Sequence, residues 1–278
     1  MSFPDSSSQP KTQVYLVGGG PGDPELLTVK ALRIMQLADV IVYDYLISDD
    51  ILEECNPKAE LISVGKKAGN HSKPQEQINQ LLVDLANENM IVCRLKGGDP
   101  YIFGRGGEEA LLLKQNSIPY QVIPGITAAA ACSASSGIPL THRDYAQSIQ
   151  FITGHFKADV VPSAVNGIDN LATDSKTNDN HKIPAKVQGH NWQALACANQ
   201  TLVVYMGIIR SSTVKDKLIE HGRSPQTPVA IIEKGTRPDQ RVVTGKLVEL
   251  DTMAEQHKIG SPALIIIGEV VDLHELLV

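Results

Sequence analysis

The chain has 278 residues, of which 42% are hydrophobic and 20% charged, and its formal net charge is −6 at pH 7. This is the composition of a globular protein that can bury a sizeable core, as one large domain or two of ordinary size. The acidic balance argues against a general nucleic-acid-binding protein, which would carry a basic surface. It still allows a locally basic cleft for an acidic small molecule.

The first thirteen residues are polar and lack the basic start and apolar core of a signal peptide. Apolar runs such as Ala263–Ile267 are too short to span a bilayer, so we expect no membrane contact. The histidines show no metal-binding spacing, and no CxxC pair occurs among Cys55, Cys93, Cys132 and Cys197. We therefore expect no metal site and a reducing, cytoplasmic compartment.

In the first half of the chain, apolar runs with strand character alternate with helical patterns. Strands are predicted at 14–17, 40–43, 61–64, 91–95 and 120–123, and helices at 26–38, 75–87 and 128–135. In the first of these helices, Leu27, Ala31, Ile34 and Ala38 fall on one face. Alternation of this kind predicts a mainly parallel sheet with helices on both faces.

The second half has more strands and fewer helices. Strands are predicted at 148–153, 202–205, 229–232, 241–244 and 263–267, and helices at 213–220 and 246–256. Consecutive strands favour a mixed, partly antiparallel sheet. We therefore predict an α/β fold with an N-terminal domain at 13–140 and a C-terminal domain at 141–278. A polar segment at about 158–191 is predicted to be an exposed insertion in the second domain.

A glycine-rich turn, Gly-Gly-Gly-Pro-Gly-Asp-Pro at 18–24, follows the first predicted strand. It fails the dinucleotide fingerprint because Asp23 stands where the last glycine should be, which counts against a nucleotide-dependent oxidoreductase. Pro21 and Pro24 also remove backbone donors that a phosphate would use. The turn suits a non-phosphate ligand, or it is a tight turn in which Asp23 caps the next helix.

A second glycine-rich segment, at 94–109, also begins at a strand end. Ligands of open α/β sheets bind at the carboxyl ends of strands, so both segments are expected to line one crevice. Gly97 and Gly98 allow close approach of the backbone to a ligand. Asp99 is either an acceptor for a ligand amine or hydroxyl, or a turn residue before Pro100.

Taken in order, the motifs of the chain resemble those of the uroporphyrinogen-III C-methyltransferases, which belong to the tetrapyrrole methylases. The resemblance extends from about residue 14 to 271 and rests on segments 17–23, 42–44, 64–69, 94–109, 122–128, 137–146 and 205–207. The Gly-Ile-Pro-Leu-Thr-His-Arg-Asp sequence at 137–144 favours this enzyme over later precorrin methyltransferases and over diphthine synthases.

The resemblance implies a two-domain fold with the active site between the domains, a homodimer, and S-adenosylmethionine as cofactor, released as S-adenosylhomocysteine. The residues that it implies as cofactor contacts are Pro21, Gly97, Gly98, Asp99, Ile102, Thr127, Ala128, Met206, Ala230 and Gly235. From its own surroundings in the sequence, Met206 would instead be a strand-end core residue.

The resemblance also implies Asp44 as proton acceptor and Lys66 as proton donor. The chemistry supplies a reason for the first role, because a pyrrole carbon that attacks the methyl sulfonium becomes part of a cationic ring. A bridge proton must then leave, and a positioned carboxylate can take it. Without the resemblance, Asp44 would be read as a turn residue and Lys66 as a solvated charge.

The implied reaction converts uroporphyrinogen III to precorrin-2 by two methylations, for sirohaem or cobalamin synthesis. The tetrapyrrole carries many carboxylates, so we expect a locally cationic cleft and name Arg105 and Arg143 as its first contacts. Tyr45 follows Asp44 where the family often has arginine. Fused relatives carry a further dehydrogenase and ferrochelatase module; without it, this chain is expected to stop at the methylated product.

Two alternatives remain open: a later precorrin methyltransferase of the same fold, and a non-catalytic sensor that binds the cofactor.

Overall fold

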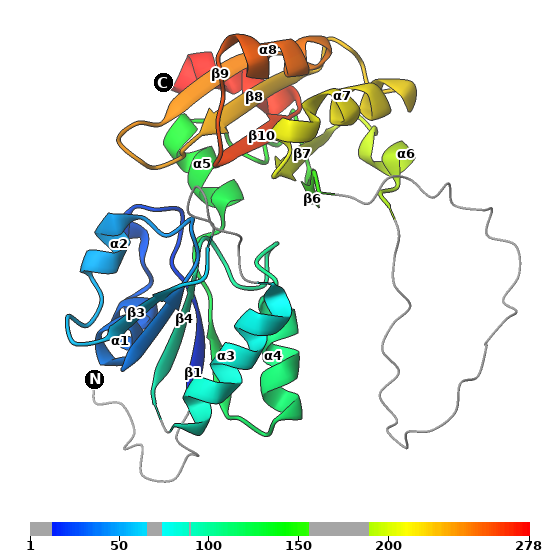
Figure 1. Ribbon diagram of the computed structural model, residues 1–278. Helices are drawn as coiled ribbons and strands as arrows, with labels where there is room; N and C mark the ends of the chain where they lie inside the picture. Colours follow the sequence, from blue (N-terminus) through cyan, green and yellow to red (C-terminus); the bar gives the residue numbers. More distant parts are fainter. Residues whose placement is uncertain (1–12, 66–73, 89, 156–188) are drawn as a thin grey trace, which may run out of the picture.

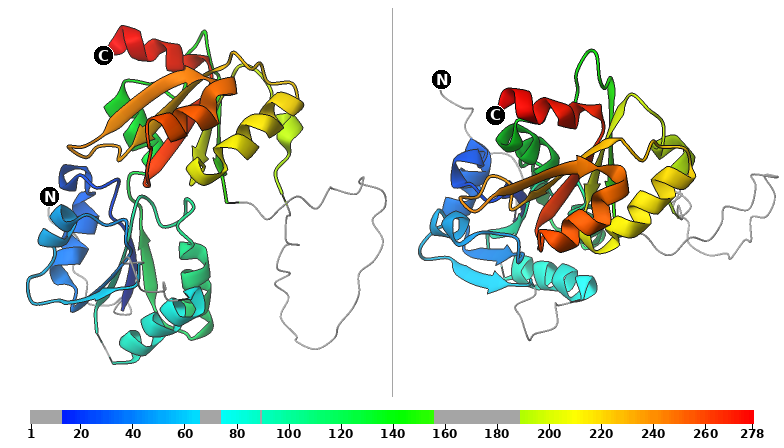
Figure 2. Two further views of the ribbon diagram at one scale, coloured as in Figure 1. Left: turned by 45° about the horizontal axis from the view of Figure 1, so that its top comes forward. Right: turned by 90° about the horizontal axis from the view of Figure 1, so that it is seen from above.

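The structure is a computed structural model that describes residues 13–65, 74–88, 90–155 and 189–278. The described elements form two lobes, one above the other in Figure 1, each built on a five-stranded sheet. The left view of Figure 2 shows the same separation, and in the right view, from above, one lobe lies over the other. The α/β class predicted from the sequence is confirmed, with one parallel and one mixed sheet.

The first sheet is parallel throughout, in the order β3-β2-β4-β1-β5. These strands are β1 (Val14–Gly18), β2 (Val40–Tyr43), β3 (Glu60–Ser63), β4 (Val92–Lys96) and β5 (Tyr120–Ile123). One face packs against α1 (Val29–Leu37) and α2 (Asp49–Glu53), and the other against α3 (Gln75–Asn87) and α4 (Gly106–Gln115). Because neighbouring residues of a strand point to opposite faces, the central strands are buried on both sides.

The second sheet has the order β6-β7-β10-β8-β9, with β6 parallel to β7 and the remaining pairs antiparallel. Its strands are β6 (Ser148–Thr153), β7 (Gln200–Tyr205), β8 (Pro228–Glu233), β9 (Arg241–Lys246) and β10 (Ala263–Ile267). One face is covered by α6 (Trp192–Leu195), α7 (Ser211–Glu220) and α8 (Leu250–Gln256). The other face is covered by α5 (Ala128–Ser136) and the 3-10 helix η4 (Glu269–Leu273), which leads into α9 (His274–Leu277).

Helix α5 precedes the predicted domain boundary, yet it packs against the second sheet. Its Ala129 and Cys132 share a core with Val203 of β7 and Ala230 of β8. The chain therefore crosses between the lobes just before α5, where β5 ends. The loop at 124–127 lies at this crossing and reaches both lobes, which matters for the site described below.

The structure contains four helices that were not predicted from the sequence, α2, α4, α6 and α9. The short 3-10 helices η1 (Pro24–Leu26), η2 (Ile208–Arg210) and η3 (Leu247–Glu249) also lie at or beside helix starts. The predicted helix at 26–38 begins only at Val29, because the side chain of Thr28 caps it by accepting a hydrogen bond from the Ala31 amide at 3.1 Å. No helix in these described ranges is long and apolar enough to cross a bilayer. The predicted insertion falls largely on 156–188, outside them.

Candidate active site

Two adjoining cavities lie where the lobes meet. The larger, about 830 Å³, is lined by residues 22–24, 43–50, 52 and 63 of the first lobe and by residues 234, 236–239, 261 and 262 of the second. The smaller, about 230 Å³, lies beside it, and the two share Leu46, Ser261 and Pro262. A ligand in the smaller cavity would therefore reach the wall of the larger one. We call the larger cavity the cleft.

The smaller cavity brings together four of the expected cofactor contacts. Pro21, Ala128, Met206 and Gly235 all line it, although they come from four separate parts of the chain. The remaining lining is mostly apolar, with three isoleucines and Leu264 from the second lobe. Apolar walls with a few polar groups at the edge are typical of small-molecule sites.

Three other expected contacts, Gly97, Gly98 and Asp99, lie where β4 ends but do not line either cavity. Gly98 forms paired backbone hydrogen bonds with Gly20, at 2.7 and 3.2 Å. Both carboxylate oxygens of Asp99 accept backbone N–H groups, from Tyr101 at 2.8 Å and from Gly125 at 3.1 Å. Asp99 therefore stabilises its own turn through Tyr101 and joins the second glycine-rich segment to the loop at 124–127 through Gly125. The first of these contacts corresponds to the turn residue that the sequence allowed as one alternative.

Tyr205, which lines the smaller cavity, is hydrogen-bonded to the loop at 124–127 and to the start of α5. The Tyr205 hydroxyl lies 2.6 Å from Thr127 Oγ1 and accepts a hydrogen bond from the Ala129 amide at 3.0 Å. Burial raises the pKa of Tyr205, so the group stays a neutral phenol. Thr127 is thus tied to the second lobe, and Ile102 packs against the same core.

Ala230, also expected to contact the cofactor, is fully buried inside β8 and lines neither cavity.

Asp44 lines the cleft and is the one partly exposed member of a buried group of charges. Arg94 Nη2 donates a short hydrogen bond to Asp44 Oδ1, and Lys96 Nζ lies 3.7 Å from Asp44 Oδ2. Glu109 Oε1 accepts from both cations, at 2.9 Å from Arg94 Nε and 2.9 Å from Lys96 Nζ. The exposed fraction of the side chain is 30% for Asp44 but 0–3% for the other three.

The buried cations differ in how readily they would lose a proton. Burial alone would lower the pKa of Arg94, but the Asp44 and Glu109 carboxylates raise it above its ordinary value. Burial, followed by the neighbouring Arg94 guanidinium, lowers the pKa of Lys96. We did not expect Arg94, Lys96 and Glu109 as site residues. The signal in the sequence was two cationic residues within an otherwise apolar strand.

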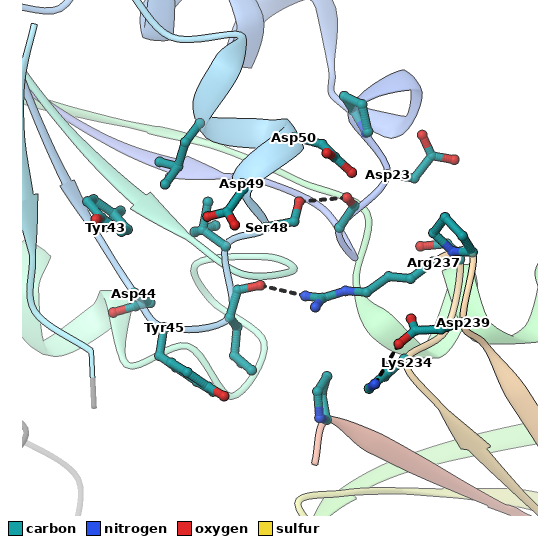
Figure 3. A pocket seen from close by; sticks show the side chains of 18 of the residues that line it. Asp23, Tyr43, Asp44, Tyr45, Ser48, Asp49, Asp50, Lys234, Arg237 and Asp239 are labelled. Carbon is teal, nitrogen blue, oxygen red and sulfur yellow. Dashed lines mark hydrogen bonds and ion pairs between the residues drawn. The ribbon is translucent and has the colours of Figure 1, made fainter. Parts of the chain in front are cut away.

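The described lining of the cleft is not cationic, contrary to our expectation. It carries five aspartates, at positions 23, 44, 49, 50 and 239, against the cations Lys234 and Arg237. Lys234 is paired with Asp239 at 2.5 Å. Figure 3 shows Arg237 reaching from the second lobe toward the first, where Nη2 donates to the Leu46 carbonyl at 2.9 Å.

The two arginines named for substrate binding lie elsewhere. Arg105 is the N-terminal cap residue of α4, its side chain is 57% exposed, and it pairs with Glu108 at 2.8 Å. Arg143 is exposed in the loop before β6. Neither lines the two cavities. Lys66, the expected proton donor, lies outside the described residues, directly after the described Gly65.

Comparison with known proteins gives one consistent result. Residues 13–251 match the family model of the Tetrapyrrole (Corrin/Porphyrin) Methylases. A siroheme synthase of Pseudoalteromonas translucida (strain TAC 125) is 53% identical over 271 residues, which are 98% of this chain and 52% of that protein. The chain thus spans about half the length of the curated relatives it matches.

Solved structures agree along nearly the whole chain. Uroporphyrin-III C-methyl transferase from Thermus thermophilus, complexed with S-adenyl homocysteine, has 34% identity and a TM-score of 0.72, with 94% of each chain covered. A cobalt precorrin-4 methyltransferase has the same TM-score at 27% identity, covering 93% of this chain and 95% of that one. With a family match over most of its length and a solved relative above 30% identity, the chain belongs to the tetrapyrrole (corrin/porphyrin) methylase family.

Proposed function

We propose that this chain transfers methyl groups from S-adenosylmethionine to carbon atoms of uroporphyrinogen III, in two successive reactions that give precorrin-2. The observation that carries this proposal is the placement of Asp44, a carboxylate fixed by Arg94 in the wall of the cleft. The cleft adjoins a smaller, mostly apolar cavity lined by Pro21, Ala128 and Met206. The siroheme synthases and the Thermus thermophilus enzyme support the choice of substrate and cofactor.

The residues of the smaller cavity fit S-adenosylmethionine. Its apolar walls suit a flat adenine ring, and Gly235 packs so closely against α5 in the cavity wall that a Cβ there would lie 2.3 Å from Cys132 Sγ. When bound, S-adenosylmethionine supplies an activated methyl group on its sulfonium. We retain all ten residues that the resemblance implied. Four of them line the cavity, and the other six would act through the loops and strand that shape it: Gly97, Gly98, Asp99, Ile102, Thr127 and Ala230.

Asp44 performs the acid–base step of the proposed mechanism. A methylated pyrrole ring is cationic and must lose a proton, which the Asp44 carboxylate accepts from its place in the wall of the cleft. Arg94 holds Oδ1, which leaves Oδ2 to receive the proton. We keep Lys66 as the proposed proton donor, on the strength of the resemblance alone.

Cationic side chains that face the cleft would hold the carboxylates of the substrate. Arg237 and Lys234 line the cleft, and a guanidinium binds carboxylates in a bidentate geometry. Arg237 Nε is buried and has no hydrogen-bond partner among the described residues, so the side chain would have to move before this N–H could meet a substrate carboxylate. Arg105 and Arg143 are proposed as contacts beyond the described lining. We further propose a homodimer in the cytoplasm, whose product feeds sirohaem or cobalamin synthesis.

A mass spectrum of the product tests the proposed function directly. The purified protein is incubated without air with uroporphyrinogen III and S-adenosylmethionine, and we expect a product that has gained two methyl groups. No gain, with S-adenosylhomocysteine still bound in calorimetry, would overturn the substrate assignment. The same assay with a later precorrin then distinguishes another methyltransferase of this fold from a sensor.

Replacing Gly235 by alanine is expected to weaken binding of S-adenosylhomocysteine about tenfold, by calorimetry. The new methyl group would lie 2.3 Å from Cys132 Sγ, so the thiol must rotate away, or α5 or the loop after β8 must shift, and each of these parts lines the cavity or adjoins it. The double variant Gly235→Ala with Cys132→Ala removes the sulfur and should recover most of the affinity. Equal weakening in the single and double variants would contradict the proposed packing of this cavity.

A further inference from the structure

The charges around Asp44 form a layered group with an order from cleft to core. Glu109 is fully buried on α4 and its Oε1 accepts three hydrogen bonds, from Arg94, Lys96 and, at 3.3 Å, from Gln75 Nε2 of α3. The two cations come next, on β4, and Asp44 lies at the cleft. Of these four charged side chains, only Asp44 has substantial exposure, at 30%.

The group carries two positive and two negative charges and is neutral when all four are ionised. An unbalanced charge at this depth is costly, so the ionisation of each member depends on the others. Arg94 is also anchored by the Val42 and Leu95 carbonyls, at 3.2 and 3.3 Å. Within the described chain, the polar partners of Lys96 Nζ are the Glu109 and Asp44 carboxylates, so this lysine can alter the charge near Asp44 without holding the strands.

We propose that Lys96 and Glu109 are positioning residues that balance the charge around Asp44, so that its carboxylate stays ionised yet can accept a proton. The inference rests on the proposed function, in which Asp44 is the proton acceptor. Lys96 attracts the negative charge of Asp44 and favours the ionised carboxylate. Glu109 competes with Asp44 for the same two cations, Arg94 and Lys96, and so weakens their hold on Asp44. The lowered pKa of Lys96 agrees with an ammonium that depends on these two carboxylates.

Other charged groups also line the cleft with Asp44. Among the described lining residues these are Asp23, Asp49, Asp50, Asp239, Lys234 and Arg237. In the described part of the chain, the cations within 4.0 Å of the Asp44 carboxylate are Arg94 and Lys96. The nearest electrostatic control therefore lies in the buried group and not across the cleft.

Two single variants should shift the pH dependence of methylation in opposite directions. Lys96→Met removes a cation 3.7 Å from Asp44 Oδ2, and the loss of its attraction for the carboxylate should move the acid limb of the kcat profile about one pH unit upward. Glu109→Gln removes an anion that competes for the two cations, which should strengthen their attraction for the Asp44 carboxylate and move the acid limb downward. The double variant Lys96→Met with Glu109→Gln removes one positive and one negative charge, so the remaining Arg94–Asp44 pair is neutral. The acid limb of its kcat profile should therefore lie close to that of the wild type.

Glu109→Gln is the decisive variant, because glutamine has nearly the same shape and still offers an oxygen to Arg94 and Lys96. The carboxylates of the substrate titrate equally in every variant and cannot produce opposite shifts. A purely structural role predicts lower activity with an unmoved acid limb, so an unmoved limb in Glu109→Gln, or shifts of one sign in both variants, would overturn the proposal.

A second measurement separates this inference from the proposed function. The Asp44 carboxyl is titrated by ¹³C NMR in protein carrying labelled aspartate, with Asp44→Asn used to assign the signal, and no substrate is needed. Opposite pKa shifts in an enzyme that does not methylate uroporphyrinogen III would refute the proposed function and leave the inference standing. If the protein methylates uroporphyrinogen III but the titration of Asp44 is the same in both variants as in the wild type, the inference is refuted and the proposed function stands.

Discussion

Replacing Asp44 by asparagine is expected to slow methyl transfer by about 10²–10⁴-fold while leaving cofactor binding nearly unchanged. Asparagine keeps an oxygen for the Arg94 guanidinium, so the side chain should hold its place, but it cannot take the proton that the methylated ring must lose. Asp44 does not line the smaller cavity, so the affinity for S-adenosylhomocysteine should change by no more than about twofold.

Single-turnover methylation of uroporphyrinogen III and calorimetry with S-adenosylhomocysteine measure these two quantities separately. The matched control is Asp84→Asn, which makes the same chemical change at an exposed site on α3, where the carboxylate accepts from Gln80 at 2.8 Å. That variant should methylate at the wild-type rate. Full activity in Asp44→Asn would remove Asp44 from the mechanism, and loss of cofactor binding would instead mean that its charge shapes both cavities.

Most of the fold could be predicted because hydrophobic patterns report local structure. The prediction of a helix at 75–87 coincides with α3, and each predicted strand overlaps an observed one within a few residues. Helix α4 escaped prediction because it begins with Gly106 and Gly107, which look like loop residues, and its apolar residues follow only from Ala110. Helix α2 has five residues and is marked mainly by the Ser48 cap, a signal too short to stand out.

The site was less predictable because its key contacts join distant parts of the chain. Arg94 and Asp44 are fifty positions apart, and no local pattern says which carboxylate a buried arginine will meet. Arg105 and Arg143 were chosen for their residue type and loop positions, but the fold sends their side chains to solvent. Arg237, which lines the cleft, lay in a segment without any pattern that distinguished it.

Replacing Gly125 by alanine is expected to lower the free energy of unfolding by about 3 kcal/mol, at the upper end of the usual cost of overpacking. A Cβ at this position would lie 2.3 Å from the Gly98 carbonyl oxygen and 2.8 Å from Gly18 Cα. These are backbone atoms of two neighbouring strand ends, which cannot turn away as a side chain can. Binding of S-adenosylhomocysteine should also weaken, because Gly125 leads into Thr127, which is hydrogen-bonded to Tyr205 of the smaller cavity, and into Ala128, which lines it.

Denaturant unfolding with and without S-adenosylhomocysteine measures both effects, and Gly107→Ala is the matched control. Gly107 lies in the first turn of α4, and no atom of the described chain beyond its own helical turn comes within 4 Å of where the added methyl group would lie. Alanine there should therefore stabilise the chain by about 0.4–1 kcal/mol. An unchanged stability in Gly125→Ala would mean that the strand ends are farther apart than this structure has them.

Gly18→Ala tests the same contact from the opposite strand, since its Cβ would lie 2.5 Å from the Gly125 amide nitrogen. We expect a similar loss of stability, and a double variant that loses less than the sum of the two. The first added methyl group already forces β1 and the loop after β5 apart, so the second enters a gap that has opened. If the losses of stability in the two single variants simply add, the two glycines are required for separate reasons. Close contact between the end of β1 and the loop after β5 would then not be the shared reason.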